Sequence, residues 1–164
     1  MDNADFHVDK TITVASAAAG SSGTADVIFE PSHLGDVHTT LTISSPSGGD
    51  YIIPLHGHCL PPKPQGPFII KPGSSLTIPF KNIYMQTKQF TFSIDNPAFV
   101  VKSGDSLKSR KIYNILVSYD AKQADAKVVK TAKLTVACLS SAKAGAGLHG
   151  EPSWVFYLKG VPPM

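Results

Sequence analysis

The sequence predicts an all-β protein with two β-sandwich units in tandem, of which the first is partial. Three observations support this fold class. Apolar and polar residues alternate in about ten short segments, with the two-residue period of half-buried strands. A proline-rich run divides these segments into two groups. Motifs of the first group recur in the second, but nothing in the first group corresponds to residues 67–94.

The first unit is predicted to hold four strands, joined by turns rich in glycine, serine and proline. Residues 15–23, ASAAAGSSG, contain too much glycine and serine for a helix and indicate a loop. Residues 46–50, PSGGD, are typical of a hairpin turn between the last two strands. The strands are expected at 6–14, 27–29, 37–43 and 51–56.

The boundary between the units falls at a run of prolines. Four of them lie close together: Pro61, Pro62, Pro64 and Pro67. Because proline has no amide donor and a fixed φ, this run favours an extended spacer. The net charge changes sign at the same place. Residues 1–60 carry one lysine and seven acidic residues (−6), and residues 61–164 carry fourteen basic and five acidic residues (+9). We therefore predict domains at 1–60 and 61–164.

The second unit is predicted to be a complete sandwich. No stretch of the chain shows the 3.6-residue apolar period of a helix. Short strands separated by regular turns favour a β-sandwich. The strands are expected at 76–80, 90–94, 99–101, 113–119, 132–138 and 154–158, with polar connections at 103–111, 120–127 and 140–152.

An internal repeat shows what the first unit lacks. The corresponding segments are Asp2-Asn3 with Asp95-Asn96, Phe6-x-Val8 with Phe99-x-Val101, Leu41-Thr42-Ile43 with Leu134-Thr135-Val136, and Tyr51 to Gly57 with Trp154 to Gly160. The first unit therefore starts at the position that corresponds to Asp95 and is predicted to be the C-terminal part of a unit. Either the chain is cut from a longer one, or a partner supplies the missing strands.

The motifs resemble a known domain family. The order of residues from Val27 through Phe29, Pro31 and Gly35 to Ile53-Pro54-Leu55-x-Gly57 is similar to the immunoglobulin-like ASH domain. ASH stands for ASPM, SPD-2 and Hydin, and the domain belongs to the PapD-like and major-sperm-protein group. Segments 64–68 (PQGPF), 78–82 (IPFKN) and 95–99 (DNPAF) are more specifically similar to Hydin-like axonemal proteins, and most to the branch of cilia- and flagella-associated protein forty-seven.

The resemblance implies tandem immunoglobulin-like sandwiches and a structural role. Its members are very long ciliary proteins with serial ASH domains, attached to the central apparatus of motile axonemes. The chain would then be a non-enzymatic protein-interaction module in the cytoskeleton of a cilium or flagellum, needed for motility and assembly. The alternative is a major-sperm-protein-type adaptor that captures acidic peptide motifs in a basic groove. A periplasmic pilus chaperone is disfavoured, because the acidic N-terminus shows no secretory signal.

Candidate metal and catalytic residues are few. His56 and His58 would share one face of a strand beside Cys59, but a tetrahedral zinc site needs further ligands at compatible spacing. We therefore expect polar strand-end residues and no metal. Cys138 falls in the inward register of its strand, and both cysteines are expected to stay reduced and unpaired. The serine pairs lack a G-x-S-x-G context, so we predict neither a catalytic residue nor a cofactor.

A basic face of the second unit is the strongest candidate for binding. Its simplest interpretation is a solvated, solubilising surface. The functional interpretation is an acidic partner, such as another axonemal protein, tubulin or a neighbouring ASH domain. Nucleic acid is disfavoured because exposed aromatic residues are not interleaved with the lysines. A membrane is disfavoured because no run of about eighteen apolar residues exists, and no small-molecule substrate is expected. The basic residues are Lys102, Lys108, Arg110, Lys111, Lys122, Lys127, Lys130 and Lys133.

Overall fold

The computed structural model describes residues 3–14, 20–124, 127–139 and 151–162. The described residues form strands, turns and one 3-10 helix, and none of them lies in an α-helix. The predicted all-β, immunoglobulin-like sandwich is therefore confirmed. In the described part of the chain, no helix is long and apolar enough to cross a membrane. The chain divides into two compact units, unit 1 at Met1–Cys59 and unit 2 at Leu60–Met164.

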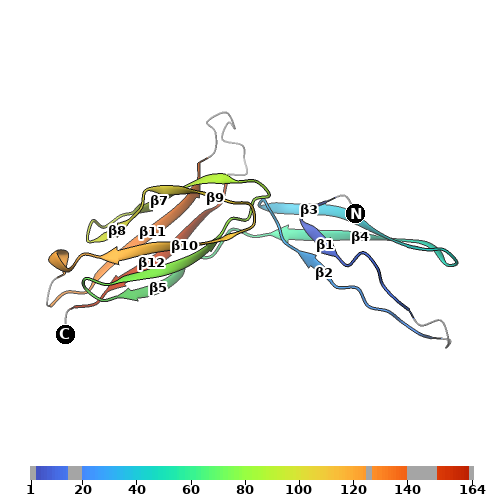
Figure 1. The fold of residues 1–164 in the computed structure, drawn as a ribbon, viewed down its shortest axis with the longest axis horizontal. Coiled ribbons are helices and arrows are strands. Elements are labelled where there is room, and N and C mark those ends of the chain that lie inside the picture. The colour runs from blue at the N-terminus through green and yellow to red at the C-terminus, as the bar shows by residue number, and fades with distance from the viewer. Residues whose placement is uncertain (1–2, 15–19, 125–126, 140–150, 163–164) are drawn as a thin grey trace. The chain divides into compact units, whose positions relative to one another are not determined.

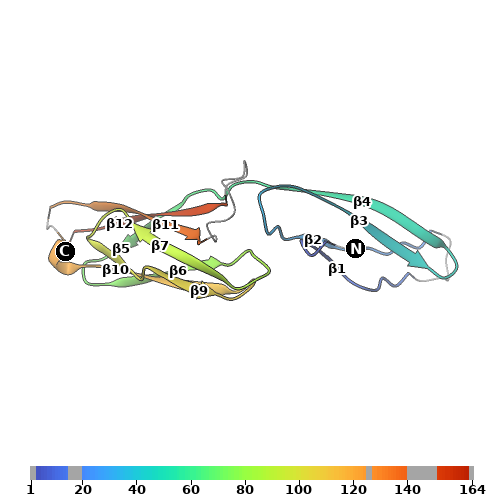
Figure 2. The ribbon, with the colours of Figure 1, turned by 90° about the horizontal axis from the view of Figure 1, so that it is seen from above.

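Unit 2 is a sandwich of two sheets that face each other (Figure 2). Its strands are β5 Gln65–Ile70, β6 Ser75–Lys81, β7 Lys88–Ile94, β8 Phe99–Val101, β9 Gly104–Leu107, β10 Ile112–Tyr119, β11 Lys130–Cys138 and β12 Ser153–Gly160. One sheet has the order β6-β10-β8, and the other has the order β5-β12-β11-β7-β9. Neighbouring strands are antiparallel, except that β5 and β12 are parallel.

The core of unit 2 comes from the alternate residues that the strands turn inward. Phe90 on β7, Val117 on β10 and Leu134 on β11 are each 0% exposed. Burying such a side chain contributes roughly 1.5–3 kcal/mol. The rings of Phe80 and Phe90 meet edge to face, with centroids 5.2 Å apart. The two-residue period of the sequence thus determines which side chains form the core.

Unit 1 consists of two pairs of antiparallel strands (Figure 1). A short pair is formed by β1 Phe6–Val8 and β2 Val27–Phe29. A long hairpin is formed by β3 Gly35–Ser45 and β4 Gly49–Cys59, closed at Ser45 and Gly49 as the glycine-rich turn predicts. Figure 2 shows the hairpin lying over the short pair. The assignment of unit 1 as the C-terminal part of an ASH domain stays a prediction.

The internal repeat extends to the hydrogen bonds of the turn before the first matched strand. In unit 1 the amide of Asp5 donates to Asn3 Oδ1 at 2.8 Å. In unit 2 the amide of Ala98 donates to Asn96 Oδ1 at 3.0 Å. Asparagine favours such turns because its side-chain oxygen can accept a bond from a backbone amide two residues on. The same residue thus builds the same turn in both units.

Both units also pack an aromatic ring against a glycine of a facing strand. Phe29 on β2 and Tyr119 on β10 each contact a phenylalanine ring of the neighbouring strand, the first pair tilted and the second stacked, with centroids 4.7 and 4.8 Å apart. A Cβ added at Gly57 on β4 would lie 2.4 Å from the Phe29 ring, and one at Gly160 on β12 would lie 2.5 Å from the Tyr119 ring. Only glycine permits this close approach. The repeat therefore sets how the sheets of each unit pack.

Two strands differ from the prediction. The expected spacer contains β5, and the connection expected at 103–111 contains β9. Because β5 is the last strand of its sheet, it tolerates Pro67, which cannot donate to a ladder. β9 lacks an apolar period but pairs with β7. The strand expected at 6–14 is limited to β1. Parts of the two small-residue loops, residues 15–19 and 140–150, lie outside the described residues.

Candidate interaction surface

The eight basic residues of the predicted face do not come together in one place. Six of them fall into two groups at opposite ends of β10 (Figure 1). We name these groups the β9–β10 cluster (Lys108, Arg110 and Lys111) and the β10–β11 cluster (Lys122, Lys127 and Lys130). The eight residues of β10, at about 3.3 Å each, separate the two ends by roughly 25 Å. The role of both clusters in protein binding stays a prediction.

A buried asparagine holds the backbone of the β9–β10 cluster. Asn82, directly after β6, is 0% exposed, and its amide donates to the carbonyl of Lys111 at 3.0 Å. The two N–H groups of its Nδ2 are shared among three carbonyls within hydrogen-bond distance, those of Gln86 (3.0 Å), Leu107 (3.0 Å) and Lys108 (3.1 Å). Its Oδ1 accepts from the amide of Tyr84 (2.9 Å). Because these buried polar groups would otherwise be unpaired, Asn82 fixes the connection in one conformation.

The connection that Asn82 fixes contains an unusual backbone conformation. The backbone φ of Arg110 is 58°. Among the described residues, it is the one residue other than glycine whose φ is positive. A left-handed conformation costs roughly 1–2 kcal/mol for a residue with a Cβ. The amide of Arg110 donates to the carbonyl of Tyr84 at 3.3 Å, which helps to hold this turn. Lys108 and Lys111 on either side of Arg110 are exposed. The turn thus presents two lysines on a fixed backbone.

A neighbouring carboxylate engages Lys102. Lys102 Nζ lies 2.8 Å from Asp105 Oδ2, to which the hydroxyl of Tyr113 also donates at 2.8 Å. The amide of Ser106 donates to Asp105 Oδ1 at 2.8 Å. The bond from Lys102, followed by those from Tyr113 and Ser106, lowers the pKa of Asp105 to about 2. The same bond raises the pKa of Lys102. Lys102 is thus matched by a local negative charge and contributes little to a basic surface.

The β10–β11 cluster begins in the 3-10 helix η1, Ala121–Gln123. Asp120 caps this helix, because its Oδ1 accepts from the amide of Lys122 at 2.9 Å. Lys122 and Lys127 are exposed, whereas Lys130, the first residue of β11, is partly buried. Lys133 is exposed further along β11, and its amide donates to the Oδ1 of Asp95 at 2.7 Å. Exposed lysines therefore occur at this end as well.

Unit 1 carries a histidine cluster where the sequence offered a candidate metal site. His56 Nε2 and His58 Nδ1 lie 2.9 and 2.7 Å from one atom, Asp36 Oδ1. The bonds to His56 and then His58 lower the pKa of Asp36. His38 stacks on His56, with ring centroids 4.3 Å apart. Pairing of β3 with β4 brings Asp36 and His38 to this cluster, which sequence spacing could not show. The described residues include no group of three or more ligands arranged for a metal.

The cysteines show no sign of reactivity. Cys59 lies in unit 1 and Cys138 in unit 2, and no disulfide joins cysteines in the described part of the chain. Partial burial raises the pKa of both thiols, which disfavours the nucleophilic thiolate. Cys138 packs against the core of unit 2, as its inward register predicts.

Comparison with known proteins gives relatives along almost the whole chain. The chain is 45% identical over 161 residues, 98% of its length, to the hydrocephalus-inducing protein homolog of Homo sapiens. It is 42% identical over 163 residues, 99% of its length, to the hydrocephalus-inducing protein of Mus musculus. No family model matches. The chain spans 3% of the length of each relative. It is therefore similar over almost its whole length to one short segment of these long proteins.

Proposed function

We propose that this chain is a structural and protein-interaction module of a large ciliary protein, located at the central apparatus of a motile axoneme. The observation that carries this proposal is the similarity along 98% of the chain to a hydrocephalus-inducing protein. The resemblance of its motifs to the ASH domains of Hydin-like axonemal proteins supports the ciliary location. The role is mechanical and non-enzymatic: the module holds partners in place in the cytoskeleton of the cilium or flagellum.

The charge of the two units suggests the kind of partner. Residues 61–164 carry a net charge of +9 and residues 1–60 carry −6. Exposed lysines lie at both ends of β10, at Lys108 and Lys111 and at Lys122 and Lys127. Two such points suit a broad acidic surface, such as the acidic tails of tubulin or an acidic neighbouring domain. A peptide-capturing adaptor would instead need its charges in one groove, so this placement favours the scaffold.

Co-sedimentation of the whole chain with microtubules tests this proposal. We expect binding at roughly 50 mM salt and a steep loss by 200 mM, because exposed charges are screened beyond about 8 Å at physiological ionic strength. Two matched variants change the charge equally at the two ends of β10: Lys108→Glu with Lys111→Glu, and Lys122→Glu with Lys127→Glu. Each should weaken binding, while unfolding stability should change by about 0.5 kcal/mol or less because these side chains are exposed.

Microtubules without their acidic tails are the control, and light scattering in parallel detects binding between copies of the chain. If neither assay shows association at low salt, the lysines only keep the protein soluble. If only one pair of substitutions matters and a short acidic peptide competes fully, the peptide-binding adaptor is the better description.

A further inference from the structure

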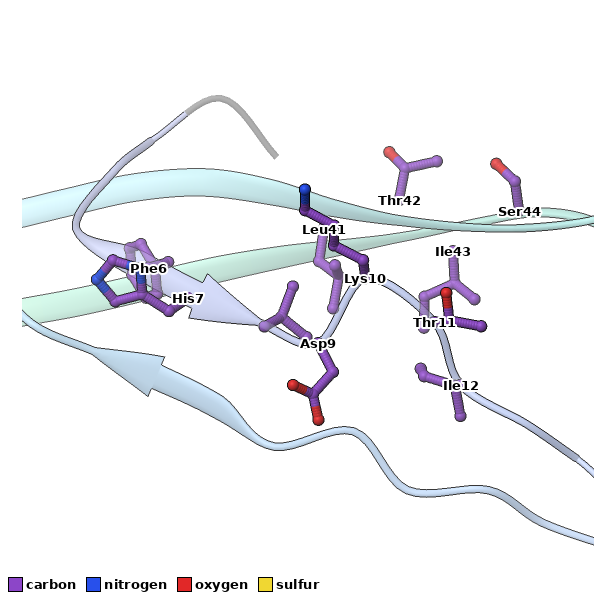
Figure 3. A pocket seen from close by; sticks show the side chains of 11 residues that line it. Phe6, His7, Asp9, Lys10, Thr11, Ile12, Leu41, Thr42, Ile43 and Ser44 are labelled. Atoms are coloured by element: carbon purple, nitrogen blue, oxygen red, sulfur yellow. The ribbon is translucent and has the colours of Figure 1, made fainter.

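Units 1 and 2 both have an open groove, and the charges that border the two grooves differ. The groove of unit 1, of about 650 Å³, lies between residues 6–12 and residues 41–44 (Figure 3). Its lining includes one residue of each sign, Asp9 and Lys10, so charge selects no class of partner for it. The groove of unit 2 is different, because its charged lining residues are lysines.

The groove of unit 2 lies beside β10, along a part of this strand that has no partner on one side. β8 pairs with β10 at Val117, Ser118 and Tyr119. After β8 the chain crosses to the other sheet, where β9 pairs with β7. The described residues therefore give β10 no strand partner on this side along residues 112–115. Two openings of about 440 and 190 Å³ lie there, and Tyr113 lines both. We name them together the β10 groove.

The backbone of β10 turns hydrogen-bonding groups toward the β10 groove. Just after β10, the amide of Asp120 donates toward β8, to the carbonyl of Ala98 at 2.9 Å. Amides of alternate residues point to the same side of a strand, so the amide of Asn114 faces the groove. On its other side Asn114 lies opposite Pro79 of β6, which has no amide to donate. An open edge of this kind is a template for strand addition.

The floor of the β10 groove is apolar. Phe92 of β7 and Ile115 of β10, both buried, line the larger opening together with Val101. On the outer face of β10 beside the open edge, Ile112 and Leu116 are 67% and 56% exposed. Covering apolar side chains is favourable by roughly 25 cal/mol per Å² of area removed from water. The groove thus suits a segment that brings at least one large apolar side chain.

The charge of the β10 groove selects the class of partner. Its lining contains Lys102, Lys108 and Lys111, and no acidic residue is found among the described residues that line it. Lys102 is matched by Asp105, whose Oδ2 lies 2.8 Å from its Nζ. Lys108 and Lys111 are left at the end of the groove where β10 begins. Charge complementarity therefore favours an acidic partner.

We propose that the open edge of β10 is a docking site for an extended acidic segment of a partner protein, which adds to the sheet as a short strand antiparallel to β10. The backbone of the segment bonds to Asn114, and one of its apolar side chains enters between Val101 and Ile115. Acidic residues toward its C-terminus meet Lys108 and Lys111. This inference deepens the proposed function and rests on it for the acidic nature of the partner.

The direction and the length of the segment follow from β8. This strand is antiparallel to β10 and ends at Val101, so a strand that continues its course runs toward Ile112. Acidic residues at its C-terminal end then reach the β9–β10 cluster. At about 3.3 Å per residue, about five residues span roughly 17 Å, less than the roughly 25 Å between the two basic clusters. The segment therefore makes one of the two contacts of the proposed module, and the β10–β11 cluster lies outside this site.

The test titrates a synthetic peptide into the whole chain at about 50 mM salt, where exposed charges are weakly screened. In this peptide valine and threonine alternate over five positions, three glutamates follow, and both ends are blocked. One control peptide has lysines in place of the glutamates, and another has the glutamates first. NMR gives the affinity and the hydrogen exchange of the Asn114 amide, and sedimentation velocity gives the oligomeric state.

We expect the peptide to bind and to slow exchange of the Asn114 amide about fivefold or more. Asn114→Pro removes this amide at an open edge, where proline is tolerated, and should weaken binding about tenfold, as expected for one lost hydrogen bond. Asn114→Ala keeps the amide and should bind at least about fivefold more tightly than Asn114→Pro.

The charge of the site is tested by a matched pair of double variants. Lys108→Glu with Lys111→Glu should weaken peptide binding about tenfold or more, because it reverses the charge at the end of the groove. Lys63→Glu with Lys71→Glu makes the same change at exposed lysines of unit 2 outside the groove and should weaken binding about threefold or less. Equal losses from the two double variants would overturn the placement of the acidic residues at the β10 groove.

Equal affinity of Asn114→Pro and Asn114→Ala would overturn strand addition, as would unchanged exchange of the Asn114 amide in the peptide-bound chain. The exchange measurement needs no variant, so it decides even if Asn114→Pro does not fold. Tighter binding of the peptide with glutamates first would overturn the antiparallel direction. No peptide binding by a chain that still sediments with microtubules would overturn this inference alone, and loss of both would overturn the proposed function too. A dimer that protects the Asn114 amide without peptide would overturn the inference by assigning the edge to a second copy.

Discussion

Leu41 in unit 1 and Leu134 in unit 2 occupy the same place in the repeat, yet their surroundings differ. Each lies across from an apolar residue of the next strand, but only Leu134 has a second neighbour, β7, on its other side. The residues that repeat in both units produce the same asparagine turn, the same strand register and the same packing of an aromatic ring on a glycine. Burial is reproduced only in part: Leu41 is 8% and Leu134 0% exposed, but Ile53, across from Leu41, is 40% exposed, whereas Phe156, across from Leu134, is 2% exposed. In this fold, the sequence pattern of a strand and the extent to which other strands cover its inner face are thus separate properties.

The ionic contacts of the two units differ as well. In unit 1, His7 lies 3.3 Å from Glu30, and His33 lies 3.5 Å from Asp5. In unit 2, Lys102 and Asp105 are both charged down to about pH 2, the pKa of Asp105. Among the described residues, the ion pairs of unit 1 thus involve histidine, whereas that of unit 2 joins a lysine to a carboxylate.

The largest difference is expected when the units are separated. Residues 60–164 alone should unfold in one cooperative transition, because that unit has its own core. Residues 1–59 alone should show no cooperative transition, since the core of this unit is small and Tyr51 and Ile53 of the hairpin are 58% and 40% exposed. Urea unfolding of dilute, monomeric samples by circular dichroism measures this. A sharp transition of isolated 1–59 would show that the hairpin and the short pair suffice.

Truncating Leu41 and Leu134, which occupy matching positions in the repeat, measures how completely each side chain is enclosed by its unit. Leu134→Ala should destabilise unit 2 by about 3–5 kcal/mol, because a rigid core cannot collapse around the cavity. Leu41→Ala should cost unit 1 less, about 2–3 kcal/mol, because Leu41 is 8% exposed but lies across from Ile53, which is 40% exposed, so the site can relax. Denaturant unfolding followed by probes in each unit gives both values. Equal losses would mean that Leu41 is as firmly enclosed as Leu134.

Asn82 belongs to a segment that has no counterpart in unit 1. Asn82→Ala removes the side-chain hydrogen bonds to three carbonyls and to the amide of Tyr84 and leaves buried polar groups unpaired, so we expect a loss of about 2–3 kcal/mol. The control is Asn96→Ala, whose side chain makes bonds to Thr131 and Ala98 at a partly exposed site and should cost about 1 kcal/mol. Equal losses from thermal unfolding would show that Asn82 does not organise the β9–β10 connection.

The smallest effect concerns pH. The pKa of Asp105 is about 2 in the fold, against about 3.9 in an unfolded chain. A lowered pKa gives stability that is fully present above about pH 4 and is lost as the pH falls through about 2. The variant Asp105→Asn should therefore lose less stability than the parent between pH 4 and pH 2. Tyr113→Phe removes one of the bonds and should raise the pKa of Asp105, which a carboxyl NMR titration would measure.

Much of the fold could be predicted because its signals are local. Alternation of residues such as Leu134 and Val136 indicates strands and their inward faces, since a strand has a period of two whatever its partner. The repeat predicted that unit 1 begins at the point of Asp95, and the matching turns at Asn3 and Asn96 agree with that alignment. The basic connections of unit 2 could be recognised from the lysine and arginine residues in their sequences. The sequence thus determined where most of the strands lie and which of their side chains face inward.

The tertiary structure decided which distant residues meet. β5 runs through Pro67 because it lies at the edge of its sheet, and β9 forms because β7 offers it a partner. Pairing of β3 with β4 placed Asp36 between two histidines, the fold brought the hydroxyl of Tyr113 to Asp105, and the length of β10 divided the basic residues between its two ends. These contacts join residues from separate strands or connections, so their spacing along the chain carries no signal of them. Local alternation fixes the direction of a side chain, whereas its neighbour depends on the order of strands in the sheet.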